Sequence, residues 1–247
     1  MASVGFQFKH FYIEHSQCAM KVGTDSIMLG SWIAPQASKN ILDIGTGSGL
    51  LALMLAQKTA EDCNILGIDI DSNAVLQAQI NAKNSPWEPR LTFAHLPLQT
   101  LRHQSALAQK FDLIMCNPPY FAENHKTNQQ NAAKQNMSRI QARQVGALTH
   151  TELLQQVDFH LAQSGSFYCV LPSDTSNAFT ENALKQGLFL QHQIQVRSTE
   201  GAKIIRQMMK FSRYSTQAQC DNLVIYTQPK QYSQQYIELC KAYYLRF

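Results

Sequence analysis

Short apolar runs alternate along the chain with stretches of helical hydrophobic spacing, a pattern typical of strands separated by helices. Strands that alternate with helices form a parallel sheet with right-handed crossovers. The sequence therefore predicts an α/β fold, Rossmann-like and doubly wound, around a mostly parallel seven-stranded sheet. The predicted strands are Asn40–Ile44, Ile65–Ile70, Leu91–Leu96, Asp112–Cys116, Ser166–Leu171, Gln191–Val196 and Leu223–Tyr226. The helices predicted between the first five strands are Leu50–Lys58, Asn73–Asn84, a weaker one near Leu98–Gln109, and Thr151–Ala162.

The pattern changes after Thr175. One further helix is predicted at Asn177–Gln186, and the strand-like segments that follow have no clear helices between them, which favours an antiparallel edge at the C-terminal end of the sheet. The tail has the helical spacing of a stripe that packs against a core. This stripe consists of Tyr232, Tyr236, Leu239 and Tyr243. With 247 residues, the whole chain, 1–247, fits a single domain.

Charge, cysteine and histidine spacing, and the length of the apolar stretches indicate which partners and which compartment to expect. The formal charge of +4 and the pI of about 8.7 permit an RNA partner without requiring one. The six cysteines form no Cys-x-x-Cys pair and the eight histidines no His-x-x-x-His pair, so we expect a reducing compartment and no metal site. The longest apolar stretch, Leu50–Ala56, is too short to span a bilayer, and the N-terminus lacks a signal-peptide core. We therefore expect a cytoplasmic protein without a membrane partner.

A glycine turn follows the first predicted strand. Gly45-Thr46-Gly47-Ser48-Gly49 opens a helix, so its backbone can approach a ligand closely. Asp69 ends the next strand, where an acidic side chain can accept both hydroxyls of a ribose. Asp43 precedes the turn and is placed to receive an ammonium group. The alternative is a tight strand-to-helix turn without a ligand.

A second motif, Asn117-Pro118-Pro119-Tyr120, ends the fourth predicted strand. Two prolines cannot continue a strand or a helix, so the turn fixes backbone groups in space. The Asn117 side-chain oxygen and the Pro118 carbonyl can each accept a hydrogen bond from an N–H group of a planar amine. The lone pair of that amine is then free to attack a methyl group. Tyr120, extended by Phe121, offers a face on which a base can stack. Together with the glycine turn, this indicates methyl transfer from S-adenosylmethionine (SAM) to nitrogen; the alternative is a simple Asn-Pro turn with Tyr120 in the core.

These residues closely resemble class I SAM-dependent amino-methyltransferases with an Asn-Pro-Pro-Tyr motif. Over its entire length the chain resembles, within that group, the bacterial valine-tRNA adenine-N(6)-methyltransferase family, which modifies the adenosine 3′ to the anticodon. The motif itself is shared with DNA, RNA and protein-glutamine methyltransferases, and Met20–Asp25 and the tail narrow the resemblance to the tRNA family. The segments that carry it are Phe6–Lys9, Cys18–Asp25, Asp43–Gln57, Asn117–Tyr120, Gln141–Arg143 and Tyr232–Leu245.

The resemblance implies that the protein uses SAM as cofactor, releases S-adenosylhomocysteine and binds tRNA. We expect it to be a monomer that holds no metal. Residues 1–30 would form an N-terminal extension that closes over the cofactor, although Met20–Asp25 alone is also compatible with a polar turn. The expected cofactor-binding residues are Lys21, Gly23, Thr24, Asp43, Gly45, Thr46, Gly47, Gly49, Asp69, Ile70, Leu98 and Asn117. The expected catalytic residues are Asn117, Pro118 and Tyr120, and the expected substrate-binding residues are Tyr120, Phe121, Arg139, Arg143 and Arg206.

One position departs from the family pattern. An acidic residue that binds the SAM adenine usually follows the third strand, but here Pro97 stands at that place. The adenine would then be held by backbone groups or by packing against Leu98, or bound more weakly.

Basic residues form two sequence clusters, which suit a phosphate backbone if both flank one sheet edge, and are otherwise ordinary solvated charge. They are Lys126, Lys134, Arg139 and Arg143, and Arg197, Lys203, Arg206, Lys210 and Arg213. Three hypotheses remain: a tRNA adenine methyltransferase, a protein-glutamine methyltransferase acting on a release factor, and a non-catalytic RNA-binding protein with a relic SAM site.

Overall fold

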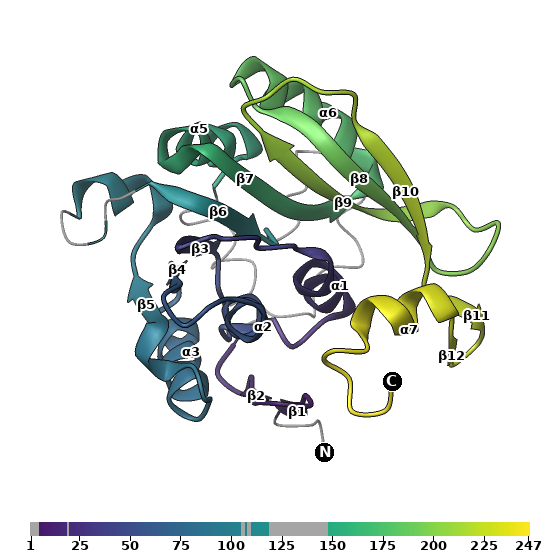
Figure 1. Ribbon diagram of the computed structural model, residues 1–247, viewed down its shortest axis with the longest axis horizontal. Coiled ribbons are helices and arrows are strands. Elements are labelled where there is room, and N and C mark those ends of the chain that lie inside the picture. Colours follow the sequence, from purple (N-terminus) through teal and green to yellow (C-terminus); the bar gives the residue numbers. More distant parts are fainter. Residues whose placement is uncertain (1–4, 19, 105–106, 108–109, 119–147) are drawn as a thin grey trace, which may run out of the picture.

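The structure is a computed structural model that describes residues 5–18, 20–104, 107, 110–118 and 148–247. Figure 1 shows a twisted central sheet with helices on both faces. Within the described residues this sheet has eight strands, in the order β10-β8-β9-β7-β6-β3-β4-β5. The predicted doubly wound α/β fold is confirmed, and the sheet has one strand more than predicted.

Five neighbouring strands of this sheet are parallel, and all five were predicted. They are β3 (Asn40–Ile44), β4 (Asn64–Asp69), β5 (Leu91–His95), β6 (Phe111–Cys116) and β7 (Leu161–Pro172). The chain passes from β3 outward to β4 and β5 and then returns to β6 on the other side of β3. This reversal makes the boundary between β3 and β6 the topological switch point, beside which ligands bind in such sheets.

The C-terminal edge contains β8 (Phe189–Arg197), β9 (Ile204–Ser212) and β10 (Gln219–Val224). Strand β9 runs antiparallel to both β7 and β8, whereas β10 pairs with β8 in parallel. The predicted antiparallel pairing at this end of the sheet is confirmed only through β9, because the two predicted strands, β8 and β10, run parallel. The strand that the sequence failed to predict is β9, and the last predicted strand begins four residues earlier than expected and ends at Val224.

Helices cover both faces of the sheet (Figure 1). Hydrophobic residues of α1, α2, α3 and α7 form one core cluster, and those of α5, α6 and the 3-10 helix η2 form the other. The bounds are α1 Thr24–Trp32, α2 Leu50–Lys58, α3 Ser72–Lys83, α5 His150–His160, α6 Ser173–Lys185, α7 Gln234–Cys240, η1 Glu88–Arg90 and η2 Leu98–His103. The weak helical pattern after Leu98 thus corresponds only to a 3-10 helix, and α1 was not predicted.

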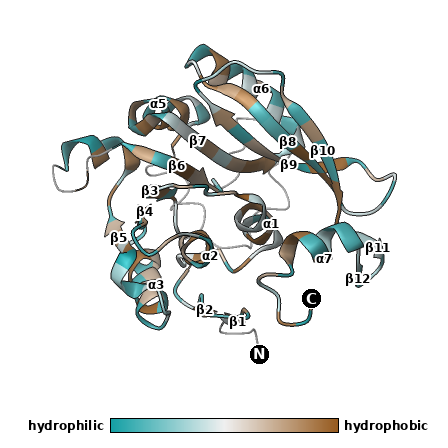
Figure 2. Cartoon of the chain, in the orientation of Figure 1, coloured by the Kyte–Doolittle hydropathy of each residue, from teal (hydrophilic) through white to brown (hydrophobic). Residues whose placement is uncertain are grey.

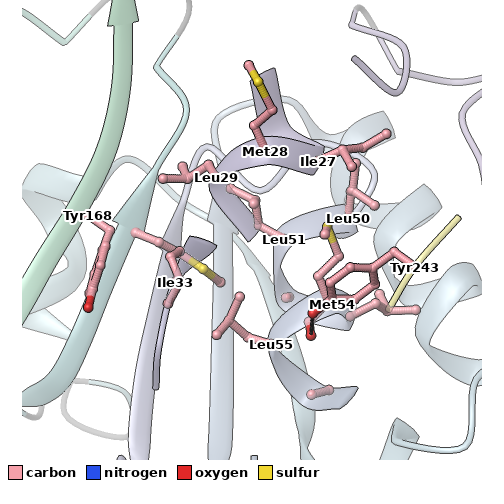
Figure 3. Packing of buried hydrophobic residues seen from close by; sticks show 14 of the residues in the cluster. Ile27, Met28, Leu29, Ile33, Leu50, Leu51, Met54, Leu55, Tyr168 and Tyr243 are labelled. Carbon is pink, nitrogen blue, oxygen red and sulfur yellow. Dashed lines mark hydrogen bonds between the residues drawn. The ribbon is translucent and has the colours of Figure 1, made fainter. Parts of the chain in front are cut away.

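Two short hairpins complete the described chain. They are β1 (Gly5–Gln7) with β2 (Tyr12–Glu14), and β11 (Tyr226–Gln228) with β12 (Gln231–Tyr232). The tail after them is helical as predicted, and its stripe packs inward, because Tyr236 and Tyr243 are fully buried. The Tyr243 hydroxyl donates a hydrogen bond to the Met54 carbonyl at 2.9 Å, which fixes the tail against α2 (Figure 3).

Helices α1 and α2 pack closely. Figure 3 shows Ile27 and Leu29 of α1 beside Leu50, Leu51 and Met54 of α2, and Figure 2 shows that α2 is mainly hydrophobic whereas α7 is largely hydrophilic. A Cβ added to Gly30 would lie 2.6 Å from the Met54 sulfur. A larger residue at this position would therefore require the flexible Met54 side chain to move.

Lys58, the last residue of α2, anchors the C-terminal end of α1. Its ammonium group donates hydrogen bonds to the carbonyls of Gly30, Ser31 and Ile33, at 2.8, 2.5 and 2.9 Å. The last carbonyls of a helix have no partner within the helix and must be satisfied from outside. One side chain therefore satisfies three such acceptors and joins the two helices.

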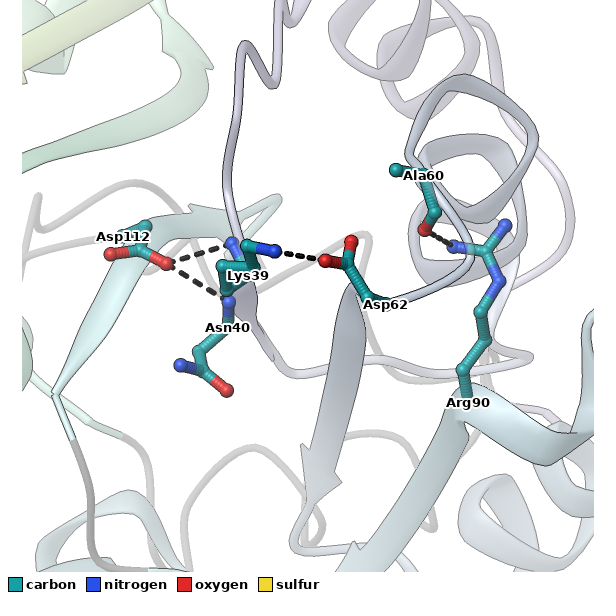
Figure 4. A network of polar contacts seen from close by, with 6 residues as sticks. All are labelled: Lys39, Asn40, Ala60, Asp62, Arg90 and Asp112. Atoms are coloured by element: carbon teal, nitrogen blue, oxygen red, sulfur yellow. Dashed lines mark hydrogen bonds and ion pairs between the residues drawn. The ribbon is translucent and has the colours of Figure 1, made fainter.

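A polar network lies at the amino ends of the parallel strands (Figure 4). The Asp112 carboxylate at the start of β6 accepts hydrogen bonds from the backbone N–H groups of Lys39 and Asn40, at 2.8 and 3.0 Å. Lys39 also pairs with Asp62 before β4. These contacts align the beginnings of the three central strands.

We expect replacement of Lys58 by methionine to lower the free energy of unfolding by about 2 to 4 kcal/mol, because three partly buried carbonyls lose their donors while the aliphatic packing is kept. Urea denaturation followed by circular dichroism measures this change. The matched control is Lys83→Met, an exposed lysine at the same position in α3, for which we expect a change within about 0.5 kcal/mol. Equal effects of the two substitutions would contradict the anchoring role.

Candidate active site

A cavity of about 340 Å³ opens at the carboxyl ends of β3 and β6. Three parts of the chain line it: residues 20–26 before and within α1, residues 45–51 except Gly49, and Asn117 with Pro118; Arg206 of β9 completes the wall. Its volume lies within the range of roughly 300 to 1,000 Å³ that small-molecule sites occupy. Because Ile44 is in register with Cys116, the turn after β3 lies directly beside Asn117.

The glycine turn forms one wall of the cavity. Gly45, Gly47 and Gly49 have φ values of +69°, +54° and +80°, in the left-handed region that favours glycine. A Cβ on Gly45 or Gly47 would meet no atom of the described residues within 4 Å, whereas one on Gly49 would lie 3.2 Å from Ala78 and Phe93. Gly49 is therefore needed for packing, and the other two leave open space at the cavity.

Two carboxylates lie behind this turn in different environments. Asp69 accepts the Gly47 N–H at 2.9 Å through Oδ2 and the Asp71 N–H at 3.0 Å through Oδ1. Burial raises the pKa of Asp69, and these two N–H groups partly offset the rise. Each of its oxygens keeps a second lone pair, which a ribose hydroxyl could use.

Asp43 is fully buried below the first turn of α2. Its Oδ2 accepts a hydrogen bond from the Thr46 hydroxyl at 2.7 Å, and its Oδ1 has no hydrogen-bond partner of normal geometry among the described residues. The pKa of Asp43 is raised to about 7, mainly by burial. The hydrogen bond from Thr46 and the nearby Ala52 N–H lower this pKa, whereas the negative charge of Asp69 raises it. A buried carboxylate with a spare oxygen suits a cationic ligand group.

Asn117 ends β6 and is oriented by the N-terminal region. Its Nδ2 donates a hydrogen bond to the Ser26 hydroxyl of α1 at 2.8 Å. No described residue donates a hydrogen bond to the Oδ1 atom of the same amide, which can therefore accept one from a ligand. Asn117 is half-buried and Pro118 is buried, so both have little room to move. Tyr120, also expected here, lies outside the described residues.

The family of the chain is shown by comparison with known proteins. Residues 35–213 match a family model described as a methyltransferase domain. The tRNA1(Val) (adenine(37)-N6)-methyltransferase of Pseudoalteromonas atlantica is 48% identical over 268 aligned residues that cover 100% of both chains. The enzyme of the same name from Citrobacter koseri is 41% identical over 98% of this chain and 95% of its own.

The chain belongs to the tRNA1(Val) (adenine(37)-N6)-methyltransferase family. It is therefore a SAM-dependent methyltransferase. Solved structures support the class I fold: a predicted O-methyltransferase from Agrobacterium tumefaciens has a TM-score of 0.64 at 13% identity, covering 89% of this chain and 96% of that one. The CcbJ methyltransferase from Streptomyces caelestis has a TM-score of 0.56 at 9% identity, covering 79% and 92%.

The residues of this methyltransferase fit SAM on three observations. The turn offers open space and backbone at Gly45 and Gly47, Asp69 keeps acceptor capacity at the end of β4, and Asp43 holds an unsatisfied oxygen that an ammonium group could satisfy. No group of three or more His, Cys, Asp or Glu residues that could hold a metal occurs in the described part of the chain. No helix of that part is long and apolar enough to cross a membrane.

The structure gathers several of the predicted cofactor residues. Lys21, Gly23 and Thr24 line the cavity together with the glycine turn. Ile70 lies at the end of β4 with 46% of its surface exposed, and Leu98 is buried in the core cluster of η2, so neither lines this cavity. Their contacts with an adenine stay predictions.

The predicted substrate residues are only partly described. Phe121, Arg139 and Arg143 lie outside the described residues, as do Lys126 and Lys134. Arg206 forms an ion pair with Asp25 of α1, with 2.8 Å between Nε and Oδ2. It therefore lies in the cavity wall, and its contact with a substrate stays a prediction.

The basic residues near the C-terminus divide between the two ends of the sheet. Arg206 lies opposite Pro172, at the end of the sheet that holds the site, whereas Lys210 lies four residues further along β9 toward the opposite end. Arg213, just beyond that strand, pairs with Asp158 of α5. Arg197 ends β8 opposite Ile204, so Arg197, Lys203 and Arg206 stay together at the site end, and the expected cluster keeps three of its five members. Lys210 and Arg213 lie apart from them because β9 was not recognised as a strand. Contact of the three residues with a phosphate backbone stays a prediction.

Three residues that position the site were missed from the sequence. Asp25 and Ser26 precede an apolar run, a helix-start pattern that was instead weighed as a polar turn. Asn81 of α3 is buried; its amide accepts the Glu14 N–H at 3.0 Å and donates to the carbonyls of Glu14 and Ser48, both at 2.8 Å. No local signal identifies it, because its partners are far away in the sequence.

The buried carboxyl group predicts a pH dependence. The pKa of Asp43 is about 7 in the folded protein against an ordinary value of 3.8, so the folded state binds more protons between these values. Its contribution to stability is then present below about pH 4 and lost as the pH rises through 7. Relative to Asp43→Asn, we expect the ligand-free wild type to lose about 2 to 4 kcal/mol of unfolding free energy between pH 4 and pH 8. Urea denaturation of both proteins across this range checks it, and parallel pH profiles would contradict it.

Proposed function

We propose that this protein transfers the methyl group of SAM to the exocyclic nitrogen N6 of the adenosine 3′ to the anticodon of valine tRNA. The proposal is supported by the family, which includes relatives of that name at 48% and 41% identity over at least 95% of both chains, and by one observation in particular. The Asn117 amide is held by Ser26, and no described residue donates a hydrogen bond to its oxygen at the cavity beside the glycine turn. This is the acceptor that an amine substrate requires.

The chain's own groups align the reaction. An aromatic amine is a poor nucleophile because its lone pair is delocalised into the ring. Asn117 Oδ1 and the Pro118 carbonyl each accept a hydrogen bond from one N–H group of the substrate amine. These two bonds favour a pyramidal nitrogen whose lone pair points into the cavity. The methylated amine is acidic enough to release its proton to water, so catalysis depends on alignment and electrostatics without a strong base.

The other wall of the cavity binds the cofactor. SAM supplies an electrophilic methyl group. Asp69 accepts the ribose hydroxyls and Asp43 the ammonium, while Gly45 and Gly47 let the backbone approach. Residues 20–26 close over the ligand from the N-terminal side.

The tRNA is bound by residues on the open side of the cavity. Tyr120 and Phe121 stack the adenine, and Arg139, Arg143 and Arg206 contact phosphates. A loop adenosine is largely unpaired, so its presentation requires unstacking but no duplex-opening wedge. We infer that the protein works as a monomer in the cytoplasm.

Label transfer tests the function. Purified protein is incubated with radioactive SAM and, separately, with unmodified valine tRNA transcript, single-stranded DNA and a release factor, and the products are digested and identified. We expect label in N(6)-methyladenosine from the tRNA only. The matched control is the same transcript with guanosine in place of the adenosine 3′ to the anticodon, which should stay unlabelled. Label on glutamine, label on DNA alone, or no transfer to any substrate would overturn the proposal.

We expect Asn117→Ala to lower kcat roughly 10²-fold, the scale observed when one oriented polar group is removed from a catalytic site. The affinity for SAM should stay within a few-fold of wild type, because the glycine turn and both carboxylates remain. Single-turnover methylation and titration calorimetry measure the two quantities. A kcat close to that of the wild type would exclude the role of the amide oxygen.

A further inference from the structure

The contact between Ser26 and Asn117 joins two parts of the chain that are 91 residues apart. Ser26 lies in the first turn of α1, and Asn117 follows β6. The distance from Nδ2 to the hydroxyl oxygen is 2.8 Å, that of a good hydrogen bond. Both residues line the cavity, so the contact lies within the site.

An asparagine amide presents opposite chemistry at its two ends. Its oxygen accepts and its nitrogen donates, and the last torsion of the side chain has broad, roughly two-fold preferences. Half a turn would present N–H groups to a substrate amine where an acceptor is needed. A partner that takes one N–H of the nitrogen selects the productive orientation before the substrate arrives.

Ser26 can act as such a partner because its helix is fixed at both ends. Next to it, Asp25 pairs with Arg206 of β9, with both side chains about three-quarters buried. At the other end, Lys58 holds the carbonyls of Gly30, Ser31 and Ile33. The hydroxyl therefore sits on a rigid element, and the bond costs little additional ordering.

We propose that Ser26 is a positioning residue for methyl transfer: it holds the Asn117 carboxamide with Oδ1 toward the amine that is methylated. This inference rests on the proposed function. It assigns to α1, besides closure of the cofactor site, a direct effect on the rate of the chemical step. Two rival roles exist for the same side chain, a contact to SAM and a contribution to folding alone.

Kinetics of single and double variants distinguish these roles. We expect Ser26→Ala to lower kcat about 10-fold, the effect of one well-placed hydrogen bond, with the KM for tRNA and the Kd for SAM within two-fold of wild type. Ser26→Thr keeps the acceptor and should recover most of the rate. In an Asn117→Ala background, Ser26→Ala should change kcat by less than two-fold, because the group on which it acts is gone.

Ser31→Ala is the matched control. Ser31 lies on the same helix and does not line the cavity, and its hydroxyl has no hydrogen-bond partner of normal geometry among the described residues. We expect the kcat and the thermal midpoint of Ser31→Ala to be those of the wild type. A kcat of Ser26→Ala within two-fold of wild type, a weaker SAM affinity with unchanged kcat, or an undiminished effect in the Asn117→Ala background would each overturn the inference.

A second measurement does not depend on the substrate. In protein labelled with ¹⁵N-asparagine, the side-chain NH₂ resonances of Asn117 are identified by their loss in Asn117→Ala. We expect Ser26→Ala, but not Ser31→Ala, to shift these resonances, and unchanged resonances would overturn the inference. If wild type fails to methylate tRNA while the resonances shift, the proposed substrate is wrong and the positioning contact stands.

Discussion

The site depends on the register between β3 and β6. Asp112 at the start of β6 binds the backbone of the first residues of β3, and at the other end Ile44 lies opposite Cys116. A slip by one residue would move Asn117 about 3.3 Å along the strand and turn its side chain to the other face of the sheet. Both faces of β3 and β6 are buried, so such a slip would also place apolar residues against the wrong core cluster.

The N-terminal region adds the third wall, and it can do so only because several long-range contacts fix it. Lys58 and the pair of Asp25 with Arg206 hold α1, and Asn81 ties the strand that carries Glu14 to the turn at Ser48. These bonds come from α2, β9 and α3, elements formed by the methyltransferase fold itself. Closure of the site and assembly of the fold are therefore coupled, and mutations in elements remote from the cavity can affect it.

The hydrophobic pattern of the sequence predicted those strands and helices whose residues all lie in the same kind of environment. The strand at Asn40–Ile44 and the helix at Leu50–Lys58 were predicted to the residue, because a strand buried on both faces and a helix that is apolar over its first seven residues differ clearly from their flanks. Strand β9 was missed because Arg206 and Lys210 interrupt its apolar residues. Those charges are compatible with a strand only because Asp25 pairs with one and the Tyr168 ring covers the other.

In the candidate site, too, some residues could be predicted from the sequence and others could not. Motif spacing predicted the positions of the glycine turn, both aspartates and Asn117, since each lies at the carboxyl end of a strand. Their roles stay predictions. It could not predict Ser26 or Asn81, whose roles arise from contacts between distant parts of the chain. Nor could it predict that Asp43 would be fully buried while Asp69 stays half-buried, because burial depends on α2 packing over the strand end.

The contrast between the two aspartates links binding to stability. Asp69 has a backbone N–H on each oxygen, and these bonds offset part of the cost of keeping the carboxylate ionised. Asp43 has only Thr46 as a side-chain donor, and its ionised form leaves one buried oxygen unsatisfied. The ligand-free fold therefore carries a cost at neutral pH that an ammonium group in the cavity would remove. If Asp43 binds the SAM ammonium group as proposed, part of the binding free energy of the cofactor would come from relief of that cost. The same cost would make this buried carboxylate selective for a cationic ligand.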